Sequence, residues 1–235
     1  MSIPLFYIQD ISSKIITLDE DTSKHIISVL RMQKEEQVLL TDGKGTKATA
    51  TIIDDNRKRC SVQIVNADKQ DQSQPKITIA ISIIKNASRF EWFLEKATEI
   101  GVSEIIPLLC ERTEKEKFRY DRMKGILVSA MLQSQQTWLP ILHQPTSFET
   151  VIKGAAQEQK FIAHCLPENK VSLTPQLSSL STNQLILIGP EGDFTPNEIN
   201  LALQNNFTPV ALGNTRLRTE TAGIVAATLI KMGKA

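Results

Sequence analysis

Two glycine-containing loops near the carboxyl terminus follow apolar runs and carry side chains suited to binding chemistry. The first begins at Gly189, after the run Leu185–Ile188, and continues through Glu191, Gly192 and Asp193. A helix start follows at once: Thr195 is a capping residue, Pro196 suits the first helical position, and Glu198 has the spacing of a capping box. Glycines at such a place let a ligand approach the backbone without meeting a β-carbon.

The second loop begins at Gly213, after Pro209–Leu212, and holds two arginines and a glutamate within five residues. Glu220 suits the first turn of a helix, where the helix dipole stabilises a negative charge. The same dipole disfavours a cation, so Arg216 and Arg218 indicate another task, such as contacting a ligand. This loop therefore predicts a second side of the same site.

The chemistry of these loops leaves two interpretations open. One is that the glycines serve only the geometry of strand-to-helix turns, which are common. The other is a ligand site, and phosphate fits it poorly: Glu191 and Asp193 are negative, no cation follows before Arg216, and the GxxxxGK[ST] pattern is absent. A neutral or cationic ligand is favoured.

The elements that position these loops alternate between strands and helices. The predicted strands are Ile77–Ile84, Ile105–Cys110, Lys160–Cys165, Leu185–Ile188 and Pro209–Leu212. The predicted helices are Arg89–Ile100, which Gly101 suits as a carboxyl-terminal cap, Asp121–Gln136, Pro196–Asn205 and Glu220–Met232. Short apolar strands separated by helices are typical of a parallel α/β sheet, which binds ligands beyond the carboxyl ends of its strands.

A polar segment, Asn66–Pro75, separates this region from a β-rich one. We expect short strands at Pro4–Ile8, Lys14–Leu18 and Cys60–Val65, a hairpin from Val38–Thr41 to Ala48–Ile53 around Asp42–Gly45, and a helix over Thr22–Met32. The sequence thus predicts two domains, residues 1–70 and 75–235.

Composition excludes several classes. The chain of 235 residues is 41% hydrophobic and 23% charged, which is ordinary for a globular protein, and its net charge of +1 leaves any basic surface local. The longest apolar run is far shorter than the roughly 20 residues of a membrane span, and we expect neither a membrane segment nor a signal peptide. Three widely spaced cysteines predict neither disulfides nor a metal site, and indicate a cytoplasmic protein.

The two loops together carry a more specific signal. GPEGDFTPNEI, followed by ALGNTRLRTETA, resembles the cofactor-binding signature of SPOUT-class RNA methyltransferases, and more narrowly that of the ribosomal RNA small subunit methyltransferase E family. The resemblance extends to RMQKEEQVLLTDGKG, RFEWFLEKATEIGV and IIPLLCERT, and so covers nearly the whole chain.

This resemblance implies a PUA-like β-barrel joined to an α/β domain with a trefoil knot, a homodimer, and S-adenosylmethionine (SAM) as cofactor. It implies methylation of N3 of a uridine in 16S rRNA, with the rRNA or the small ribosomal subunit as partner. The cofactor would lie between the two loops, on Ile188, Gly189, Glu191, Gly192, Leu212, Gly213, Leu217, Arg218 and Thr219.

Two residues are candidates for catalysis. Arg218 would stabilise negative charge on the uracil oxygens, and Glu220 would orient Arg218 or help to accept the N3 proton. Candidate RNA contacts are Arg31, Lys44, Lys85, Arg89, Arg112 and Lys115. Methylation of another RNA position or of a ribose hydroxyl, and RNA binding without catalysis, remain the alternatives.

Two departures from the family pattern concern this site. Asp193 stands where the family usually has a second consecutive glycine, so its side chain would narrow the pocket or add a polar contact. Leu132 and Gln136 stand where the family usually has a glutamate and an arginine around a Gln-Ser pair, which removes two charges.

Overall fold

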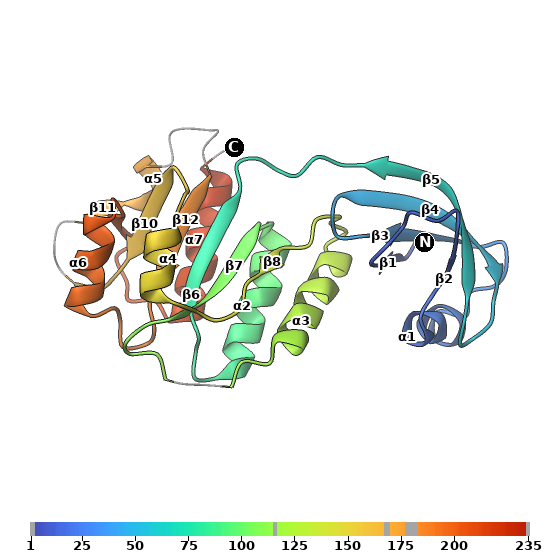
Figure 1. Cartoon of the computed structure of the whole chain (residues 1–235), viewed down its shortest axis with the longest axis horizontal. Helices are drawn as coiled ribbons and strands as arrows, with labels where there is room; N and C mark the ends of the chain where they lie inside the picture. Colours follow the sequence, from blue (N-terminus) through green and yellow to red (C-terminus); the bar gives the residue numbers. More distant parts are fainter. Residues whose placement is uncertain (1–2, 115–116, 167–169, 177–182, 234–235) are drawn as a thin grey trace. The chain divides into compact units, whose positions relative to one another are not determined.

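The chain folds into two compact units in a computed structural model that describes residues 3–114, 117–166, 170–176 and 183–233 (Figure 1). The first unit comprises Met1–Gln72 and Met131–Leu139, and the second comprises Ser73–Ala130 and Pro140–Ala235. The division at residues 70–75 stays a prediction about domains; the contacts group residues 131–139 with the first unit.

The first unit is built on one sheet with the strand order β1-β3-β4-β5-β2. Its strands are β1 (Leu5–Tyr7), β2 (Ile15–Thr17), β3 (Gln37–Thr41), β4 (Thr46–Asp54) and β5 (Ser61–Lys69). Alternate residues of β4, namely Ala48, Ala50 and Ile52, are fully buried, which is the period-two pattern of a strand with one face on a core.

The turn between β3 and β4 has the geometry expected of the Asp-Gly sequence. Gly43 and Gly45 have φ values of 67° and 93°, and the Asp42 carboxylate accepts hydrogen bonds from the backbone N–H groups of Lys44 (2.7 Å) and Thr46 (3.0 Å). A β-carbon at Gly45 would stand 2.5 Å from the Gln70 carbonyl oxygen, so only glycine fits. The predicted hairpin is confirmed.

The helix predicted over Thr22–Met32 is partly wrong. The helical segment begins earlier, with α1 (Glu20–Lys24), because Asp19 caps it and accepts a hydrogen bond from the Thr22 N–H. It continues as one π-helical segment, η1 (His25–Val29), and ends before Arg31, whose φ of 59° is incompatible with a right-handed helix.

The second unit contains a parallel sheet with the strand order β11-β13-β10-β12-β6-β7-β8, and β9 also pairs with β7. Its strands are β6 (Ile77–Ser82), β7 (Glu104–Leu109), β8 (Ile141–Leu142), β9 (Thr146–Ser147), β10 (Gln159–Ala163), β11 (Val171–Ser172), β12 (Gln184–Ile188) and β13 (Thr208–Ala211). The five predicted apolar strands are confirmed as β6, β7, β10, β12 and β13. Since β12 and β13 lie on either side of β10, the segment joining them crosses over β10; the trefoil knot stays a prediction.

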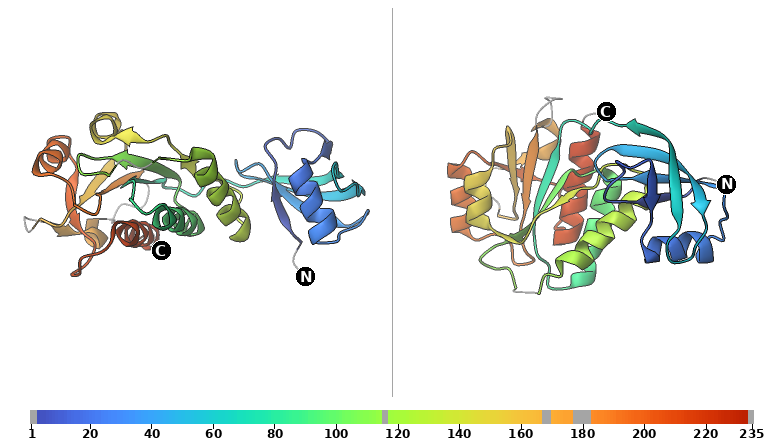
Figure 2. Two further views of the ribbon diagram at one scale, coloured as in Figure 1. Left: turned by 90° about the horizontal axis from the view of Figure 1, so that it is seen from below. Right: turned by 45° about the vertical axis from the view of Figure 1, so that its right-hand side comes forward.

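Helices cover both faces of this sheet. They are α2 (Ala87–Ile100), α3 (Tyr120–Gln133), α4 (Phe148–Gly154), α5 (Leu173–Gln176), α6 (Pro196–Gln204) and α7 (Thr219–Met232). Helices α2 and α7 lie on one face, and α4 and α6 on the other (Figure 2). Gly101 caps α2 with a φ of 89°, as predicted. The short helix α4 was not predicted, because seven residues show little helical periodicity.

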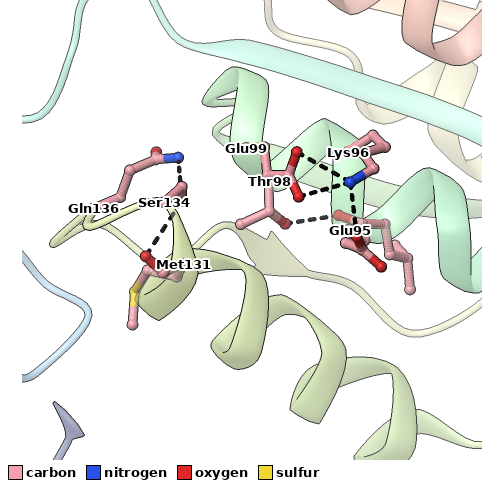
Figure 3. A network of polar contacts seen from close by, with 8 residues as sticks. Glu95, Lys96, Thr98, Glu99, Met131, Ser134 and Gln136 are labelled. Atoms are coloured by element: carbon pink, nitrogen blue, oxygen red, sulfur yellow. Dashed lines mark hydrogen bonds and ion pairs between the residues drawn. The ribbon is translucent and has the colours of Figure 1, made fainter. Parts of the chain in front are cut away.

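The outer side of α2 carries an ion-pair cluster. The Lys96 ammonium lies 2.7 Å from Glu95 Oε1 and 2.9 Å from Glu99 Oε1 (Figure 3). Because these side chains are partly exposed, the pairs contribute little to stability. Within the described residues, no helix has the length and apolar character that a membrane span requires.

The helix pair α2–α7 packs closely because Gly223 has no side chain. A β-carbon at Gly223 would lie 2.6 Å from Phe93 Cε2 and 2.9 Å from Ile81 Cδ1, both of which belong to the buried core. This glycine therefore sets the distance of α7 from α2 and the sheet, and with it the position of the loop that precedes α7.

Gly223→Ala is expected to lower the free energy of unfolding of the second unit by about 1–3 kcal/mol, because the added methyl group overpacks the core. Gly125→Ala in α3 is the matched control: its β-carbon meets no atom within 4 Å among the described residues. That change is expected to stabilise by about 0.5–1 kcal/mol through helix propensity. Chemical denaturation measures both, and equal effects of the two changes would contradict the packing argument.

Candidate functional site

Three neighbouring strands, β13, β10 and β12, end at the same edge of the parallel sheet, so the loops that follow them meet there. Two adjoining cavities of about 390 Å³ each lie among these loops. They share five lining residues, Ala163, Cys165, Arg216, Leu217 and Ala222. Each cavity has the volume of a small-molecule site.

Part of the wall of the first cavity consists of apolar side chains and exposed backbone. Val210, Leu212 and Leu217 line it, together with Gly213, whose φ is 148°. A β-carbon at Gly213 would meet no heavy atom within 4 Å in the described part of the chain, so a ligand can reach this backbone directly. Such a wall suits a flat, uncharged ring.

The second cavity combines charges of both signs. Glu191 and Asp193 line it from the loop after β12, and Arg216 and Arg218 line it from the loop after β13. A ligand with both a positive and a negative group fits this set of side chains better than a simple anion.

Two hydrogen bonds join the three loops. Thr219 Oγ1 donates to the Gly189 carbonyl oxygen at 3.0 Å, which links the start of α7 to the loop after β12. The Cys165 N–H donates to Asp193 Oδ2 at 2.8 Å, which links the loop after β10 to the same segment. The walls of both cavities are therefore fixed to one another and not only to their own strands.

Asp193, where the family resemblance implies a glycine, has a backbone conformation that glycine adopts readily. Its φ of 64° lies in the left-handed region, where glycine is at ease and aspartate is better tolerated than most residues. Its carboxylate adds a polar contact, to Cys165, and the cavity beside it remains open. Of the two outcomes expected from the sequence, the structure favours the polar contact.

The capping box predicted at the start of α6 is confirmed. Thr195 caps the helix, Pro196 follows, and the Glu198 carboxylate accepts from the Thr195 N–H at 2.8 Å. Glu198 Oε1 also accepts from the Glu111 N–H, which follows β7, at 2.9 Å. Hydrogen bonds therefore fix the loop after β12 at both of its ends, at Gly189 and at the start of α6.

Arg112, a candidate RNA contact, contacts the loop after β12. Its Nη1 donates to the Gly192 carbonyl oxygen at 2.7 Å, and its Cδ would lie 3.4 Å from a β-carbon at Gly192. The rest of the guanidinium remains available because the residue is exposed.

The two candidate catalytic residues occupy different environments. Arg218 is exposed and lines the second cavity, whereas Glu220 is buried and is not among the residues lining either cavity. The ion pair of Glu220 is with Arg89, whose Nε lies 3.8 Å from Oε1. No ion pair between Glu220 and Arg218 is found in the described residues.

The predicted cofactor residues lie together: all of them except Gly192 line the two cavities. The candidate RNA contacts are spread more widely. Arg31 and Lys44 are exposed in the first unit, Lys85 pairs with Glu114 at 2.7 Å in the second, and Lys115 lies outside the described residues. All these binding roles stay predictions.

Sequence reasoning missed the contribution of the loop after β10. Ala163, His164, Cys165 and Lys170 line the first cavity, and Lys170 Nζ donates to the His164 carbonyl oxygen at 2.9 Å. This loop has no glycine motif that would mark it as part of a site. The available signal was the apolar run Lys160–Cys165 itself, since a parallel strand between two site-bearing strands must end at the same edge.

The second departure from the family pattern leaves a local contact in place of charges. Gln136 Nε2 donates to Ser134 Oγ at 2.9 Å, and Ser134 Oγ donates to the Met131 carbonyl oxygen at 3.3 Å (Figure 3). These two hydrogen bonds between neutral groups stabilise the turn locally.

The three cysteines differ in environment. Burial, with smaller contributions from Asp54 and Asp55, raises the pKa of Cys60 to about 11, and burial raises the pKa of Cys110 further. Cys165 is exposed and lines both cavities. Among the described residues, no group of three or more His, Cys, Asp or Glu side chains is arranged to hold a metal ion.

Comparison with known proteins identifies relatives over nearly the full length. Residues 71–231 match the RNA methyltransferase domain family, and residues 18–65 match the RNA methyltransferase PUA domain family. Ribosomal RNA small subunit methyltransferase E of Synechocystis sp. is 31% identical over 216 residues, which are 90% of this chain and 71% of that protein.

Solved structures of similar proteins indicate the same family. A probable rRNA-methyltransferase from Porphyromonas gingivalis is 38% identical, with a TM-score of 0.92 over 99% of this chain and 98% of that chain. A ribosomal RNA small subunit methyltransferase E from Neisseria gonorrhoeae, bound to S-adenosyl methionine, is 28% identical, with a TM-score of 0.88 over 98% of each chain. These matches confirm the PUA-like amino-terminal part and the α/β methyltransferase part of the predicted fold.

Substitution of Asp193 tests the clamp between the loops. Asp193→Ala is expected to lower the free energy of unfolding by about 1–3 kcal/mol, because alanine is strained at a positive φ and the Cys165 N–H loses its acceptor. Asp193→Gly relieves only the strain and is expected to cost less, while Asp193→Asn keeps an acceptor and is expected to be nearly neutral. Chemical denaturation measures the order of stability of the three variants. Faster amide hydrogen exchange at Cys165 in the Ala and Gly variants would show that loss of the hydrogen bond to Asp193 is the cause. An Asn variant as unstable as the Ala variant would contradict it.

Proposed function

We propose the function of this chain from the premise that it belongs to the ribosomal RNA small subunit methyltransferase E family of RNA methyltransferases. It is a SAM-dependent rRNA methyltransferase, and its proposed substrate is N3 of a uridine in the 16S rRNA of the small ribosomal subunit. The observation that carries the proposal is the pair of adjoining cavities at the ends of β10, β12 and β13, which almost all of the predicted cofactor residues line.

The residues of these cavities fit SAM. The apolar wall of Leu212 and Leu217 and the uncovered backbone at Gly213 suit adenine, which is flat and uncharged. Glu191 and Asp193 attract a cation, which suits the sulfonium and amino groups, while the arginines opposite suit a carboxylate. When bound, SAM supplies an electrophilic methyl group for transfer to a nucleophile.

The protein contributes mainly position and charge to this reaction. In the proposal, Arg218 lies beside the target base and stabilises negative charge on the uracil oxygens as N3 loses its proton. Glu220 helps to accept that proton. The support for these roles is that Arg218 lines the charged cavity and that Glu220 follows it in the first turn of α7.

Proposed RNA contacts are the exposed cations Arg31, Lys44 and Arg112, together with Lys85 and Lys115. Each contact with a phosphate would make binding more dependent on salt. We further propose that the chain acts as a homodimer in the cytoplasm, with the knotted threading that its family resemblance implies. Exposed apolar side chains of the second unit, such as Trp92 (43% exposed) and Met232 (66% exposed), support a protein partner.

Methyl transfer from tritiated SAM tests the proposal directly. We expect label to enter the 16S rRNA of small subunits that lack the modification, and nuclease mapping to find a single N3-methyluridine. Label at another base or at a ribose would correct the substrate, and no label on subunits or free rRNA, with binding intact, would indicate a non-catalytic RNA-binding protein. Arg218→Ala is expected to lower kcat on the order of 100-fold at saturating RNA; an unchanged kcat would contradict the role of Arg218.

Cofactor binding is tested with S-adenosylhomocysteine, the product of methyl transfer. We expect it to protect Cys165 from alkylation, because this thiol lines both cavities, whereas the elevated pKa values of Cys60 and Cys110 keep those thiols unreactive. Gly213→Trp is expected to weaken binding more than tenfold in calorimetric titration, and Gly125→Trp, on the exposed side of α3, is the control. Equal affinities for both variants, or no protection, would place the ligand elsewhere.

A further inference from the structure

Two buried glutamates lie in the first turns of helices that follow the two site loops, and they differ in one respect. Glu198, in α6, is 9% exposed, and both of its carboxylate oxygens accept backbone hydrogen bonds: Oε1 from Glu111 at 2.9 Å and Oε2 from Thr195 at 2.8 Å. Both carboxylate oxygens of Glu198 are thus hydrogen-bonded, as is usual for buried polar groups in native proteins.

Glu220, in α7, is 6% exposed, but its Oε2 is out of contact with solvent and accepts no hydrogen bond from the described residues. A buried carboxylate oxygen without a donor is costly, and such a group in a native protein needs an explanation. Among the described residues it is the one buried carboxylate oxygen in this state. Glu198 shows that this fold can provide hydrogen-bond donors to both oxygens of a buried carboxylate.

The cation nearest to Glu220 is Arg89, in the first turn of α2. Its Nε lies 3.8 Å from Oε1, which is an ion-pair distance but too long for a hydrogen bond. The side chain of Arg89 is 41% exposed and that of Glu220 is 8% exposed, so the carboxylate is the buried partner. A positive charge at this distance attracts the carboxylate and holds Oε1 toward α2.

The neighbours of Glu220 belong to the wall of the charged cavity. Arg218, Thr219 and Ala222 all line it, and Thr219 also donates to the Gly189 carbonyl oxygen of the opposite loop. Glu220 therefore belongs to the segment that lines this cavity, while its own carboxylate is buried and lies next to Arg89. Because Gly223 packs against Phe93 of α2, the two helices keep Arg89 and Glu220 in register.

We infer that Arg89 is a positioning residue that acts through Glu220, and that Glu220 Oε2 is the acceptor for the proton of the target base. This rests on the proposed function. In the step, the N3–H bond of the uracil breaks and the proton forms an O–H bond with Oε2. The electron pair left on N3 forms the bond to the methyl carbon, and the pair of the carbon–sulfur bond stays on sulfur, which becomes a neutral thioether.

From the sequence, Arg89 is expected to contact an RNA phosphate. That role and the positioning role have different kinetic signatures. Loss of a phosphate contact raises KM for RNA and lowers the slope of log affinity against log salt by about one, with kcat kept. Loss of a residue that positions the proton acceptor lowers kcat and leaves both KM and the salt slope unchanged.

The experiment measures kcat, KM for the RNA substrate and the salt slope of RNA binding for Arg89→Gln, Arg89→Lys and Glu220→Gln. We expect Glu220→Gln to lower kcat on the order of 100-fold. We expect Arg89→Gln to lower kcat by about tenfold or more, and Arg89→Lys, which keeps the charge, to restore most of it. In the double variant, Arg89→Gln should add nothing to the effect of Glu220→Gln, since both act through one group.

Arg122→Gln is the matched control. It breaks another Arg–Glu ion pair of the second unit, with Glu91 of α2 (2.9 Å between Nη2 and Oε2), and should leave kcat unchanged. Thermal unfolding and S-adenosylhomocysteine affinity, measured for every variant, separate loss of folding from loss of catalysis. If Arg89→Gln unfolds at the assay temperature, the comparison is made with Arg89→Lys and Glu220→Gln.

Three results would overturn the inference: a raised KM and a smaller salt slope for Arg89→Gln with kcat kept, full kcat for Glu220→Gln, or additive effects in the double variant. These results differ from failure of the proposed function, in which the wild-type chain itself transfers no methyl group to N3 of a uridine. A merely structural ion pair would lower the unfolding temperature in both variants and leave kcat intact.

Discussion

The hydrogen bond from Thr219 Oγ1 to the Gly189 carbonyl oxygen is the contact on which the site depends. It joins the first residue of α7 to the first residue after β12, two points thirty residues apart in the chain. With the Cys165–Asp193 contact it makes one preformed wall from three loops. A site held in this way needs little rearrangement on binding, which favours ligand affinity.

Electrostatics explains how one site can serve a ligand of mixed charge. The loop after β12 supplies carboxylates and the loop after β13 supplies guanidinium groups, so opposite charges face the same cavity. The acidic loop that excluded a phosphate ligand in the sequence is the feature that suits a sulfonium cofactor. Arg112 adds a positive charge beside the acidic loop, where it donates a hydrogen bond to the Gly192 carbonyl oxygen.

Two buried glutamates of the second unit differ in their hydrogen bonding, and only one of them has a proposed role in the chemistry. Glu198, Thr195 and Glu111 satisfy each other and fix the start of α6. Glu220 is buried with one oxygen unsatisfied in the described chain, and it stands at the start of the helix that lines the charged cavity. A buried polar atom without a hydrogen bond is tolerated at a functional site, where a substrate can supply the missing partner.

By itself the sequence determined the elements whose signals are local. Neighbouring residues predicted the capping box at Thr195–Glu198, the left-handed cap at Gly101, the Asp42–Gly43 turn and the five apolar strands. The two long motifs indicated the family and two of the three loops that meet at the cavities. Only the tertiary structure decided the partners of groups far apart in the chain. It paired Glu220 with Arg89, Arg112 with Gly192 and Asp193 with Cys165, and it brought the end of β10 into the site. The physical reason is that backbone conformation responds to adjacent residues, whereas side-chain partners are set by strand order and helix packing. These bring together residues such as Arg89 and Glu220, which are 131 positions apart.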